Sequence, residues 1–337
     1  MISIDGSHGE GGGQVLRTSL GLSAIHGTEI EIGNIRSNRP NPGLRPQHLA
    51  TLEAFRKITK GRLTGGGIGA MEVRFRPSGI YSGKYEFDIG TAGSTTLMLH
   101  ALLLPLLFAD GPSDIRIRGG TDVPWSPTVD YYGNVTLKAL EMMGVRTKLE
   151  VLRRGYYPKG GGLVSLHVEP WADRAPLSSA GVGEPSRIFL SSCSAGLGED
   201  VASRQIAGAV GVLNTENTST SIDRGGFGVG SSLTLWARAG DLPIGFSSLG
   251  KKGLLAEEVG SRAASGLLDI IRSGSVDRHL PDQIVPFLSL IGSESILPAP
   301  MLTGHLATNL DVINLFGNVP WSYDGKKVII KGKIKED

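Results

Sequence analysis

The sequence predicts an α+β/α/β protein: a large domain of three βαβαββ repeats, with a small α+β domain of four strands and two helices inserted in the third. Residues 2–76 and 84–168 show the same expected order of strands and helices, which indicates an internal repeat. The composition changes to Pro, Ser, Ala and Gly from residue 169 to residue 185, which marks a boundary. We therefore expect a large domain of residues 1–183 and 276–337 and an inserted domain of residues 184–275.

The composition is that of an ordinary soluble globular protein. The 337 residues are 40% hydrophobic and 20% charged. This length suffices for a large core and favours two domains over one. The net charge of +2 excludes polyanion binding by bulk electrostatics, so contacts with nucleic acid must come from local clusters. The 49 glycines indicate many tight turns, phosphate-binding loops, or both.

The single cysteine, Cys193, excludes an internal disulfide and a cysteine-based zinc site and is typical of a reducing cytoplasm, where we expect the protein. The first residues lack the basic and apolar regions of a signal peptide. The longest apolar run, Leu97–Ala109, is interrupted by His100 and Pro105 and is shorter than the about 20 residues that a bilayer requires. We interpret it as a buried helix and expect neither membrane association nor an obligate protein partner.

The first unit begins with a strand, a glycine loop and a helix. Residues 2–4 alternate as a short strand, residues 9–14 have the sequence GEGGGQ, and apolar spacing over residues 15–22 predicts a helix. Such a junction presents free backbone N–H groups and the positive end of a helix dipole, which suits a phosphate; a tight turn is the alternative. Glu10 favours a divalent cation here, because a carboxylate facing bound phosphates needs one between them.

An arginine-rich loop follows the next predicted strand, residues 29–32. It spans residues 33–45 and leads into a predicted helix over residues 47–57 and a strand over residues 71–76. Its three arginines, Arg36, Arg39 and Arg45, have planar guanidinium groups that match phosphate oxygens. They are candidates for binding a polyphosphate or an RNA end, and a solvated loop with incidental charge is the alternative.

The second unit repeats this order. Its predicted strands and helices are residues 84–88, 95–108, 114–118, 129–143, 146–152 and 163–168. The loop before its second helix carries Asp122, Trp125 and Pro127, which suit either a planar base or a turn. The loop at residues 153–162, RRGYYPKGGG, is the most compact basic and aromatic cluster of the chain. It suits single-stranded nucleic acid, although a plain hairpin would also use its glycines.

The inserted domain and the tail complete the chain. For the inserted domain we expect strands at residues 187–191, 218–223, 233–237 and 244–247 and helices at residues 201–213 and 254–271. For the tail we expect a helix at residues 282–291, a strand near residues 294–297, a helix that begins near residue 305, and strands at residues 320–323 and 327–331. With a strand near Leu177, the tail completes a third unit.

His305 lies near the start of the last predicted helix. It follows Gly304, and Leu306, Leu310 and Ile313 follow it at helical spacing. A histidine on the first turn of a helix is well placed for a nucleophile. Taken alone, such a histidine is more often a helix cap or a packed ring than a catalyst.

Several unusual motifs occur in order along the chain. They are residues 9–14 with Arg17, the loop with Arg36 and Arg39, GTAGS at residues 90–94, RGYYPKGGG at residues 154–162 and GHLATN at residues 304–309. Together they resemble the RNA 3′-terminal phosphate cyclase family, and the resemblance runs from near Ile2 to the last strand. It implies a large domain of three βαβαββ units with a small α+β domain inserted in the third.

The resemblance also implies a reaction. In the family, a histidine at the position of His305 attacks the α-phosphorus of ATP, which gives a histidyl-adenylate and pyrophosphate; a neutral imidazole is suited to this attack. The adenylate passes to an RNA 3′-phosphate, and the neighbouring 2′-hydroxyl then displaces AMP to leave a 2′,3′-cyclic phosphate. The RNA 3′-phosphate must be activated, because AMP leaves its phosphorus far more readily than oxide or hydroxide does. Electrostatic positioning is expected to carry most of the catalysis.

Site residues follow from the same resemblance, which implies ATP with Mg²⁺ or Mn²⁺ as cofactors and RNA with a 3′-phosphate end as the substrate. Glu10 would hold the cation, Gln14, Arg17, Arg36 and Arg39 would contact phosphates, Pro127 would lie against the adenine, and Asp282 and Gln283 would lie close to the nucleoside. Two residues depart from the family pattern. His100 stands where a glutamine near the phosphates is expected, and His279 stands where a tyrosine would stack on adenine.

Other functions fit parts of the sequence. A non-catalytic cyclase-like ribosome-assembly protein would have the same fold without the nucleophile, so His305 and Glu10 disfavour it. An enolpyruvyl-transferase-like enzyme would be built from similar βαβαββ units and bind phosphorylated small molecules, but would form no covalent nucleotide. A purely RNA-binding module is disfavoured by the small net charge.

Overall fold

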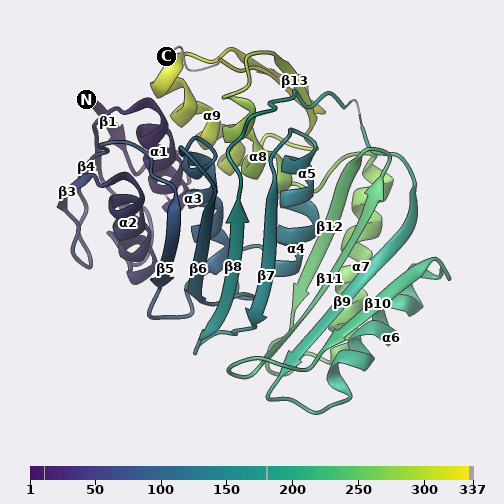
Figure 1. The fold of residues 1–337 in the computed structure, drawn as a ribbon. Coiled ribbons are helices and arrows are strands. Elements are labelled where there is room, and N and C mark those ends of the chain that lie inside the picture. Colours follow the sequence, from purple (N-terminus) through teal and green to yellow (C-terminus); the bar gives the residue numbers. More distant parts are fainter. Residues whose placement is uncertain (11, 180, 334–337) are drawn as a thin grey trace.

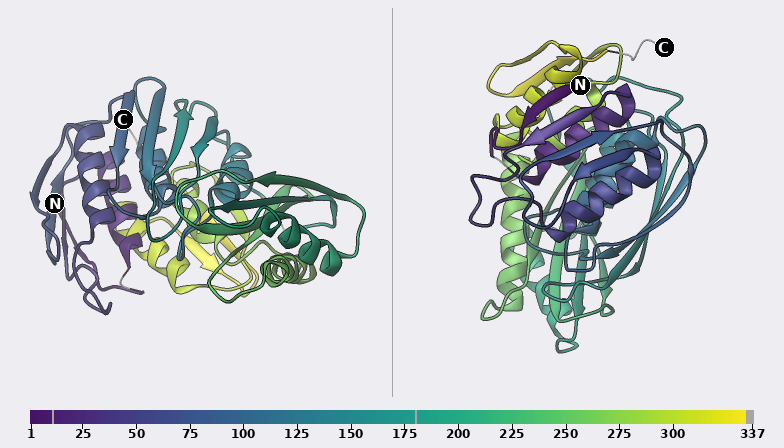
Figure 2. Two further views of the ribbon diagram at one scale, coloured as in Figure 1. Left: turned by 90° about the horizontal axis from the view of Figure 1, so that it is seen from below. Right: turned by 90° about the vertical axis from the view of Figure 1, so that its left-hand side faces the viewer.

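The computed structural model describes residues 1–10, 12–179 and 181–333 and has a mixed α/β fold with four small sheets (Figure 1). The predicted α+β/α/β class is therefore confirmed. The first and last segments of the chain lie side by side, whereas the sheet drawn in green extends away from them (Figure 2). No helix in the described ranges is long and apolar enough to cross a membrane.

The first sheet has the order β1-β2-β4-β3. Its strands are β1 (Ile2–Asp5), β2 (Ile30–Gly33), β3 (Arg62–Gly65) and β4 (Val73–Arg76), and its helices are α1 (Gly13–His26) and α2 (Pro46–Thr59). Strands β1 and β2 are parallel, and the other pairs are antiparallel. Val73 and Phe75 are buried between exposed arginines, which is the alternation expected of a half-buried strand. Strand β3 has no such alternation and is mostly exposed, so the sequence did not single it out.

The second sheet has the corresponding order β5-β6-β8-β7 and the same parallel and antiparallel pairs. Its elements are β5 (Gly83–Asp88), α3 (Thr95–Leu106), β6 (Ser113–Gly119), α4 (Val129–Tyr131), the π-helical segment η1 (Tyr132–Thr136), α5 (Leu137–Glu141), β7 (Thr147–Arg153) and β8 (Gly162–Val168). The prediction of one regular helix over residues 129–143 was wrong. The wider turn contains Gly133 and Asn134, which are weak formers of α-helix.

The third segment forms the sheet β10-β9-β11-β12 with two helices on one face (Figure 1). Its elements are β9 (Pro185–Ala195), α6 (Val201–Leu213), β10 (Thr218–Asp223), β11 (Gly230–Ala239), β12 (Leu242–Leu249) and α7 (Ala256–Ser273). The opposite face packs against the second unit: a Cβ at Gly245 would lie 2.6 Å from Cγ2 of Val135. The preceding segment is not a loose linker, because Trp171 is buried and its indole N–H donates to the carbonyl of Met143 at 2.9 Å.

The C-terminal segment contributes α8 (Leu280–Leu288), β13 (Glu294–Pro298), α9 (Gly304–Gly317), β14 (Trp321–Tyr323) and β15 (Lys327–Lys331). Its sheet has the antiparallel order β13-β15-β14. Ser178 forms a single parallel bridge with Ile296 beside β13, where a strand near Leu177 was expected. Helix α9 packs against α1, so the end of the chain lies on its beginning.

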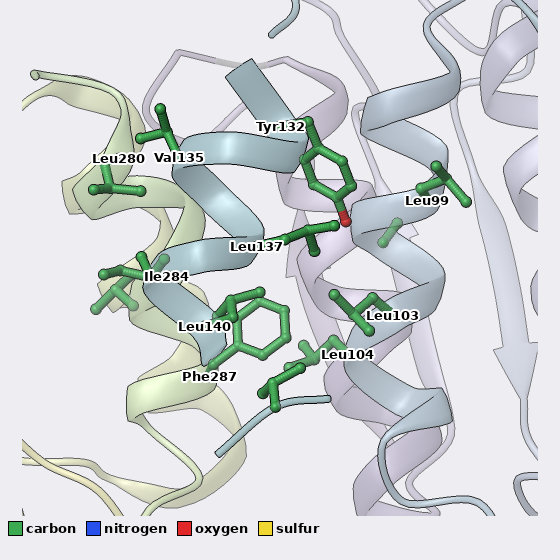
Figure 3. Packing of buried hydrophobic residues seen from close by; sticks show 14 of the residues in the cluster. Leu99, Leu103, Leu104, Tyr132, Val135, Leu137, Leu140, Leu280, Ile284 and Phe287 are labelled. Carbon is green, nitrogen blue, oxygen red and sulfur yellow. The ribbon is translucent and has the colours of Figure 1, made fainter. Parts of the chain in front are cut away.

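A shared helical core supports the loops that follow the strands. Leu99 and Leu103 of α3, Tyr132 of η1 and Phe287 of α8 point toward one another between the helices (Figure 3). All four side chains are fully buried or nearly so. Helices of the second unit and of the C-terminal segment are therefore held in fixed positions, and α8 carries the predicted site residues Asp282 and Gln283.

Candidate active site

His305 lies on the first turn of α9, as predicted. The helix begins where Thr303 caps it, because the Thr303 hydroxyl accepts a hydrogen bond from the backbone N–H of Leu306 at 3.1 Å. The His305 side chain is 36% exposed, and its Nε2 lies 3.1 Å from Oε2 of Glu10. The imidazole is thus accessible to a ligand and held by one carboxylate.

Two glycines bring Glu10 to His305. A Cβ at Gly304 would lie 2.8 Å from Oε1 of Glu10, so the carboxylate passes over the bare backbone of the helix start. Gly9 has a φ of 60° and packs against α9, where its Cβ would lie 1.9 Å from Oγ1 of Thr308. Only glycine fits this left-handed position without displacing the helix. The loop after β1 is therefore fastened to α9, some 300 residues away in sequence, and His8 adds a 2.8 Å contact with Asp311.

Gln14, Asp282 and Asn309 connect the starts of α1, α8 and α9. The Gln14 amide donates to the carbonyl of His305 at 3.1 Å and makes a long 3.5 Å contact with Oδ2 of Asp282. Asn309 donates to the Asp282 carbonyl at 2.6 Å and accepts from the hydroxyl of Thr18 at 2.7 Å. Oδ1 of Asp282 is buried and has no hydrogen-bond partner among the described residues. This oxygen is available to a ligand.

The predicted arginines differ in their surroundings. Arg39 approaches Oε2 of Glu10 at 3.8 Å, and Arg17 is partly buried with no ion pair in the described part of the chain. Arg36 instead donates to the carbonyls of Asn41 and Gly43 at 2.8 and 3.0 Å, so it holds the loop together as well as adding charge. Arg39 and Arg45 lie close enough to Arg36 to lower its pKa further, after burial itself. Arg39 thus has one carboxylate partner, whereas Arg17, Arg36 and Arg45 have no ion pair among the described residues.

His48 is a member of this group that the sequence did not indicate. Its Nδ1 accepts the backbone N–H of Arg45 at 3.0 Å, so in the neutral ring Nε2 carries the proton. A Cβ at Gly13 would lie 2.6 Å from this Nε2 and 2.9 Å from a terminal nitrogen of Arg17. Burial, and then the neighbouring arginines, lower the pKa of His48 to about 3. The only sequence signal was a histidine on the first turn of the helix after the arginine loop.

The remaining predicted residues lie on or next to α3, η1 and α8. Nε2 of His100 contacts the carbonyl of Gln283 at 2.8 Å, and the Gln283 side chain accepts from the hydroxyl of Thr136 at 2.6 Å. Burial lowers the pKa of His100 to about 4. The Pro127 carbonyl accepts from Thr96 at 2.9 Å, which ties the loop after β6 to α3. His279 lies next to the N-terminus of α8 and accepts from Nε of Arg278 at 3.1 Å.

The electrostatics of the site favour a neutral histidine beside uncompensated cations. Burial lowers the pKa of His305, Glu10 raises it, and Arg17, His279 and Arg39 lower it, with a net decrease. Burial lowers the pKa of Arg17 to about 10, and only Asp282 acts against this. Burial, and then Asp277, raise the pKa of Asp282 to about 8. An imidazole that is neutral at pH 7 has a lone pair for nucleophilic attack.

Glu10 is the only carboxylate in direct contact with His305 in the described ranges, and no group of three or more metal-binding side chains occurs there. Mg²⁺ commonly binds one or two carboxylates and takes its other ligands from water and substrate phosphates. The half-exposed Glu10 carboxylate therefore fits a cation that binds together with a polyphosphate.

Arg154 and Asp122, from the two turn-rich loops of the second unit, form a separate buried cluster. Arg154 contacts Asp122, Asp130 and Asp223 at 3.3, 2.9 and 2.9 Å, and Ser232 donates to Asp122 at 3.2 Å. The residues of the basic loop thus differ in role: Arg154 joins the second unit to the third sheet, whereas Arg153, Tyr157 and Lys159 are exposed.

Together, the helix starts, the glycine loop and the arginines make this an α/β protein with a cationic site around a histidine. Residues 8–322 match the family model described as RNA 3′-terminal phosphate cyclase. The chain belongs to the RNA 3′-terminal phosphate cyclase family.

Relatives that carry this name are similar over nearly their whole length. The proteins of Pyrococcus furiosus and Archaeoglobus fulgidus are each 43% identical, over 100% and 98% of this chain and 97% and 100% of their own. The protein of Thermococcus onnurineus is 45% identical over 94% of this chain and 93% of its own. Among solved structures, the enolpyruvyl transferase NikO from Streptomyces tendae aligns with a TM-score of 0.43 and 11% identity, over 98% of this chain and 48% of its own, which is too distant to support an argument.

Proposed function

We propose that this protein converts an RNA 3′-phosphate end to a 2′,3′-cyclic phosphate with ATP, through a histidyl-AMP and an RNA(3′)pp(5′)A intermediate. The observation that carries the proposal is the contact between His305 and Glu10 at 3.1 Å, beside Arg17, which has no ion pair among the described residues. Family membership and the names of the relatives support the same reaction. The single cysteine favours a cytoplasmic location.

Each step has a distinct leaving group. His305 attacks the α-phosphorus of ATP, forming an N–P bond while the bond to pyrophosphate breaks. An oxygen of the RNA 3′-phosphate then attacks the same phosphorus, and the neutral imidazole leaves. Finally the RNA 2′-hydroxyl attacks the terminal phosphorus, AMP leaves, and the hydroxyl proton is released. Because the lowered pKa of His305 keeps its ring neutral, no deprotonation must precede the first step.

The residues around His305 would bind the charged parts of ATP. Gln14, Arg17, Arg39 and the ring of His48 surround the start of α1, where they and the free backbone N–H groups suit phosphates. Arg36 would add charge from the supporting loop. Glu10 would hold Mg²⁺ or Mn²⁺, which would neutralise charge on the phosphates and on pyrophosphate as it leaves.

The nucleoside would lie toward α8. Asp282 has a buried oxygen with no partner in the described ranges, which suits a hydroxyl or amino donor. His279 and Pro127 would border the adenine, with Gln283 and His100 behind them, since the latter two bond to each other. His279 is planar and would stack in place of the tyrosine expected there.

The fold supports a further proposal on organisation. The first two sheets share one strand order and one set of pairings, and the Ser178 bridge beside β13 gives the C-terminal sheet the same arrangement. We infer three βαβαββ repeats, with residues 184–275 inserted in the third. Each repeat would then contribute the N-terminal turns of its helices to the site.

The proposed chemistry is tested by labelling. Incubation with ATP that carries a labelled α-phosphate and Mg²⁺ should leave an acid-labile, alkali-stable adduct on the protein, and His305→Ala should abolish it. His167→Ala is a matched control, because His167 also contacts carboxylates but lies on β8. RNA ending in a 3′-phosphate should become resistant to phosphatase only with ATP and metal. Equal labelling of His305→Ala would refute the nucleophile, and an enolpyruvyl-transferase-like or non-catalytic protein would show no labelling at all.

A further inference from the structure

We propose that the exposed residues Arg153, Tyr157, Lys159 and Phe227, here called the aromatic platform, bind the RNA nucleotides that precede the terminal 3′-phosphate. This inference rests on the proposed function, since it assigns a surface to the rest of the substrate strand. The chemistry recognised is that of a single strand: unpaired bases and a phosphate backbone.

The platform combines exposed rings with fixed cations. Tyr157 is 66% exposed and Phe227 is 46% exposed, which is unusual for large aromatic side chains in a protein whose core is otherwise well filled. The Arg153 guanidinium lies 5.6 Å from the centre of the Phe227 ring, and its Nε donates to the carbonyl of Gly161 at 2.8 Å. Bases stack on such rings, and adjacent cations contact the backbone phosphates.

Two loops from different parts of the fold hold the platform in shape. The backbone N–H of Phe227 donates to the carbonyl of Arg154 at 2.8 Å, and Tyr156 donates to the Phe227 carbonyl at 3.3 Å. A Cβ at Gly161 would lie 2.4 Å from the Phe227 ring, so the ring rests on bare backbone. The ion pairs that Arg154 makes with two aspartates hold both loops in place. The exposed rings are therefore preorganised, and binding would order little of the protein.

The platform is joined to the candidate active site by loops in direct contact. A Cβ at Gly160 would lie 2.7 Å from the carbonyl oxygen of Thr91, which places the platform loop against the glycine loop after β5. A Cβ at Gly93, in that same glycine loop, would lie 2.9 Å from Cβ of Gln47, the neighbour of His48. The platform loop and the start of α2 thus both contact the glycine loop, and an RNA strand whose end reaches the arginines would continue across this loop to Tyr157.

The charge of the platform fits the backbone of RNA. Neither Arg153 nor Lys159 forms an ion pair with any described residue, and both side chains are exposed. Their positive charges are free to replace the counterions of a nucleic acid. This local charge matters because the net charge of the whole chain is only +2.

The test is binding of fluorescent RNAs with a 3′-phosphate, measured by anisotropy without ATP. An RNA of about ten nucleotides should span the platform, whereas a dinucleotide should not. Tyr157→Leu should weaken the longer RNA by about tenfold or more and leave the dinucleotide unchanged, and Tyr157→Phe should restore binding. Lys159→Gln should flatten the dependence of log K on log salt by about 0.7.

Tyr81→Leu is the matched control. Tyr81 lies near a cation, as Phe227 of the platform does, since Nζ of Lys60 lies 3.8 Å from its ring centre. Tyr81 precedes β5, whereas the connecting glycine loop follows that strand. The Tyr81→Leu variant should bind both RNAs with the affinity of the parent protein. Melting curves of all variants establish that they are folded.

The outcomes separate the platform from the proposed function. Equal affinity of Tyr157→Leu and parent for the longer RNA, or an equal loss for both RNAs, would overturn the platform. If the slope of log K against log salt is unchanged in Lys159→Gln, Lys159 makes no phosphate contact and the charge argument is overturned. Failure of the proposed function would appear elsewhere, as the absence of the labelled adduct with ATP, while the binding results would still decide whether RNA uses this surface.

Discussion

Arg154 is buried and Arg17 is partly buried, and these two arginines have opposite environments. Arg154 contacts three carboxylates within 3.3 Å; although burial by itself lowers its pKa, Asp122 and Asp130 raise it well above the ordinary value. Arg17 has only the more distant Asp282 to offset burial, and its pKa falls to about 10. A buried charge that is surrounded by carboxylates stabilises the fold, whereas a partly buried charge without an ion pair is suited to binding an anion.

The carboxylates repeat this contrast. Burial raises the pKa of both Asp122 and Asp282. Asp122 nevertheless has Thr121, Ser232 and Arg154 as partners, whereas Oδ1 of Asp282 has none among the described residues. In the region around His305, therefore, polar groups lack partners among the described residues.

The largest effect should come from Arg154→Met. Removal of the guanidinium leaves Asp122 and Asp130 buried without their cation, which should lower the free energy of unfolding by about 3–5 kcal/mol. Urea unfolding measures this loss. Arg153→Met is the control, because Arg153 is adjacent but exposed, and its stability should stay within about 0.5 kcal/mol of the parent. A stable Arg154→Met variant would contradict the structural role.

Arg17→Met should have the reverse effect: it should reduce activity and leave stability unreduced. Loss of a phosphate contact that strengthens in the transition state should slow formation of the labelled adduct by about 100- to 1,000-fold. Stability should be unchanged or increased, since no described carboxylate loses a direct partner. Rates of labelling and melting temperatures give both values. An unstable variant with a normal rate would place Arg17 with Arg154 in the fold.

The sequence predicted which residues matter in this comparison better than it predicted their contacts. The spacing of Leu306, Leu310 and Ile313 placed His305 on a helix start, as the structure has it. The same reasoning did not separate Arg154 from Arg153, because neighbours in a loop differ only in what the fold brings to them. His48 was missed since its role depends on contact with α1, and the π-helical turn at Tyr132 alters the regular spacing that predicts a helix.

Gly304→Ala should have a smaller effect on the same site. The new methyl group would lie 2.8 Å from Oε1 of Glu10, so the carboxylate must move away from its present position beside His305. We expect labelling to slow by about tenfold. Alanine is the better helix former by up to about 1 kcal/mol, so the melting temperature should not fall. Gly317→Ala, at the far end of α9 with open space around it, is the control.

His167→Gln should have the smallest effect on stability. It tests whether an ion pair that is not buried stabilises the fold. His167 contacts Asp114 and Glu169 at 2.8 Å each on the exposed side of β8, and Glu169, followed by Asp114, raises its pKa. A raised pKa in the folded state means that the contribution to stability is complete below the unfolded value of 6.5 and disappears as the pH rises through the folded value.

The His167→Gln variant should therefore lose no more than about 1 kcal/mol near pH 5 and nothing near pH 9. Unfolding by urea at both pH values measures the difference. A loss that is equal at the two pH values would indicate that the ring packs rather than pairs. A loss as large as that of Arg154→Met would show that ionic partners alone, and not their burial, distinguish the structural cluster from the site around His305.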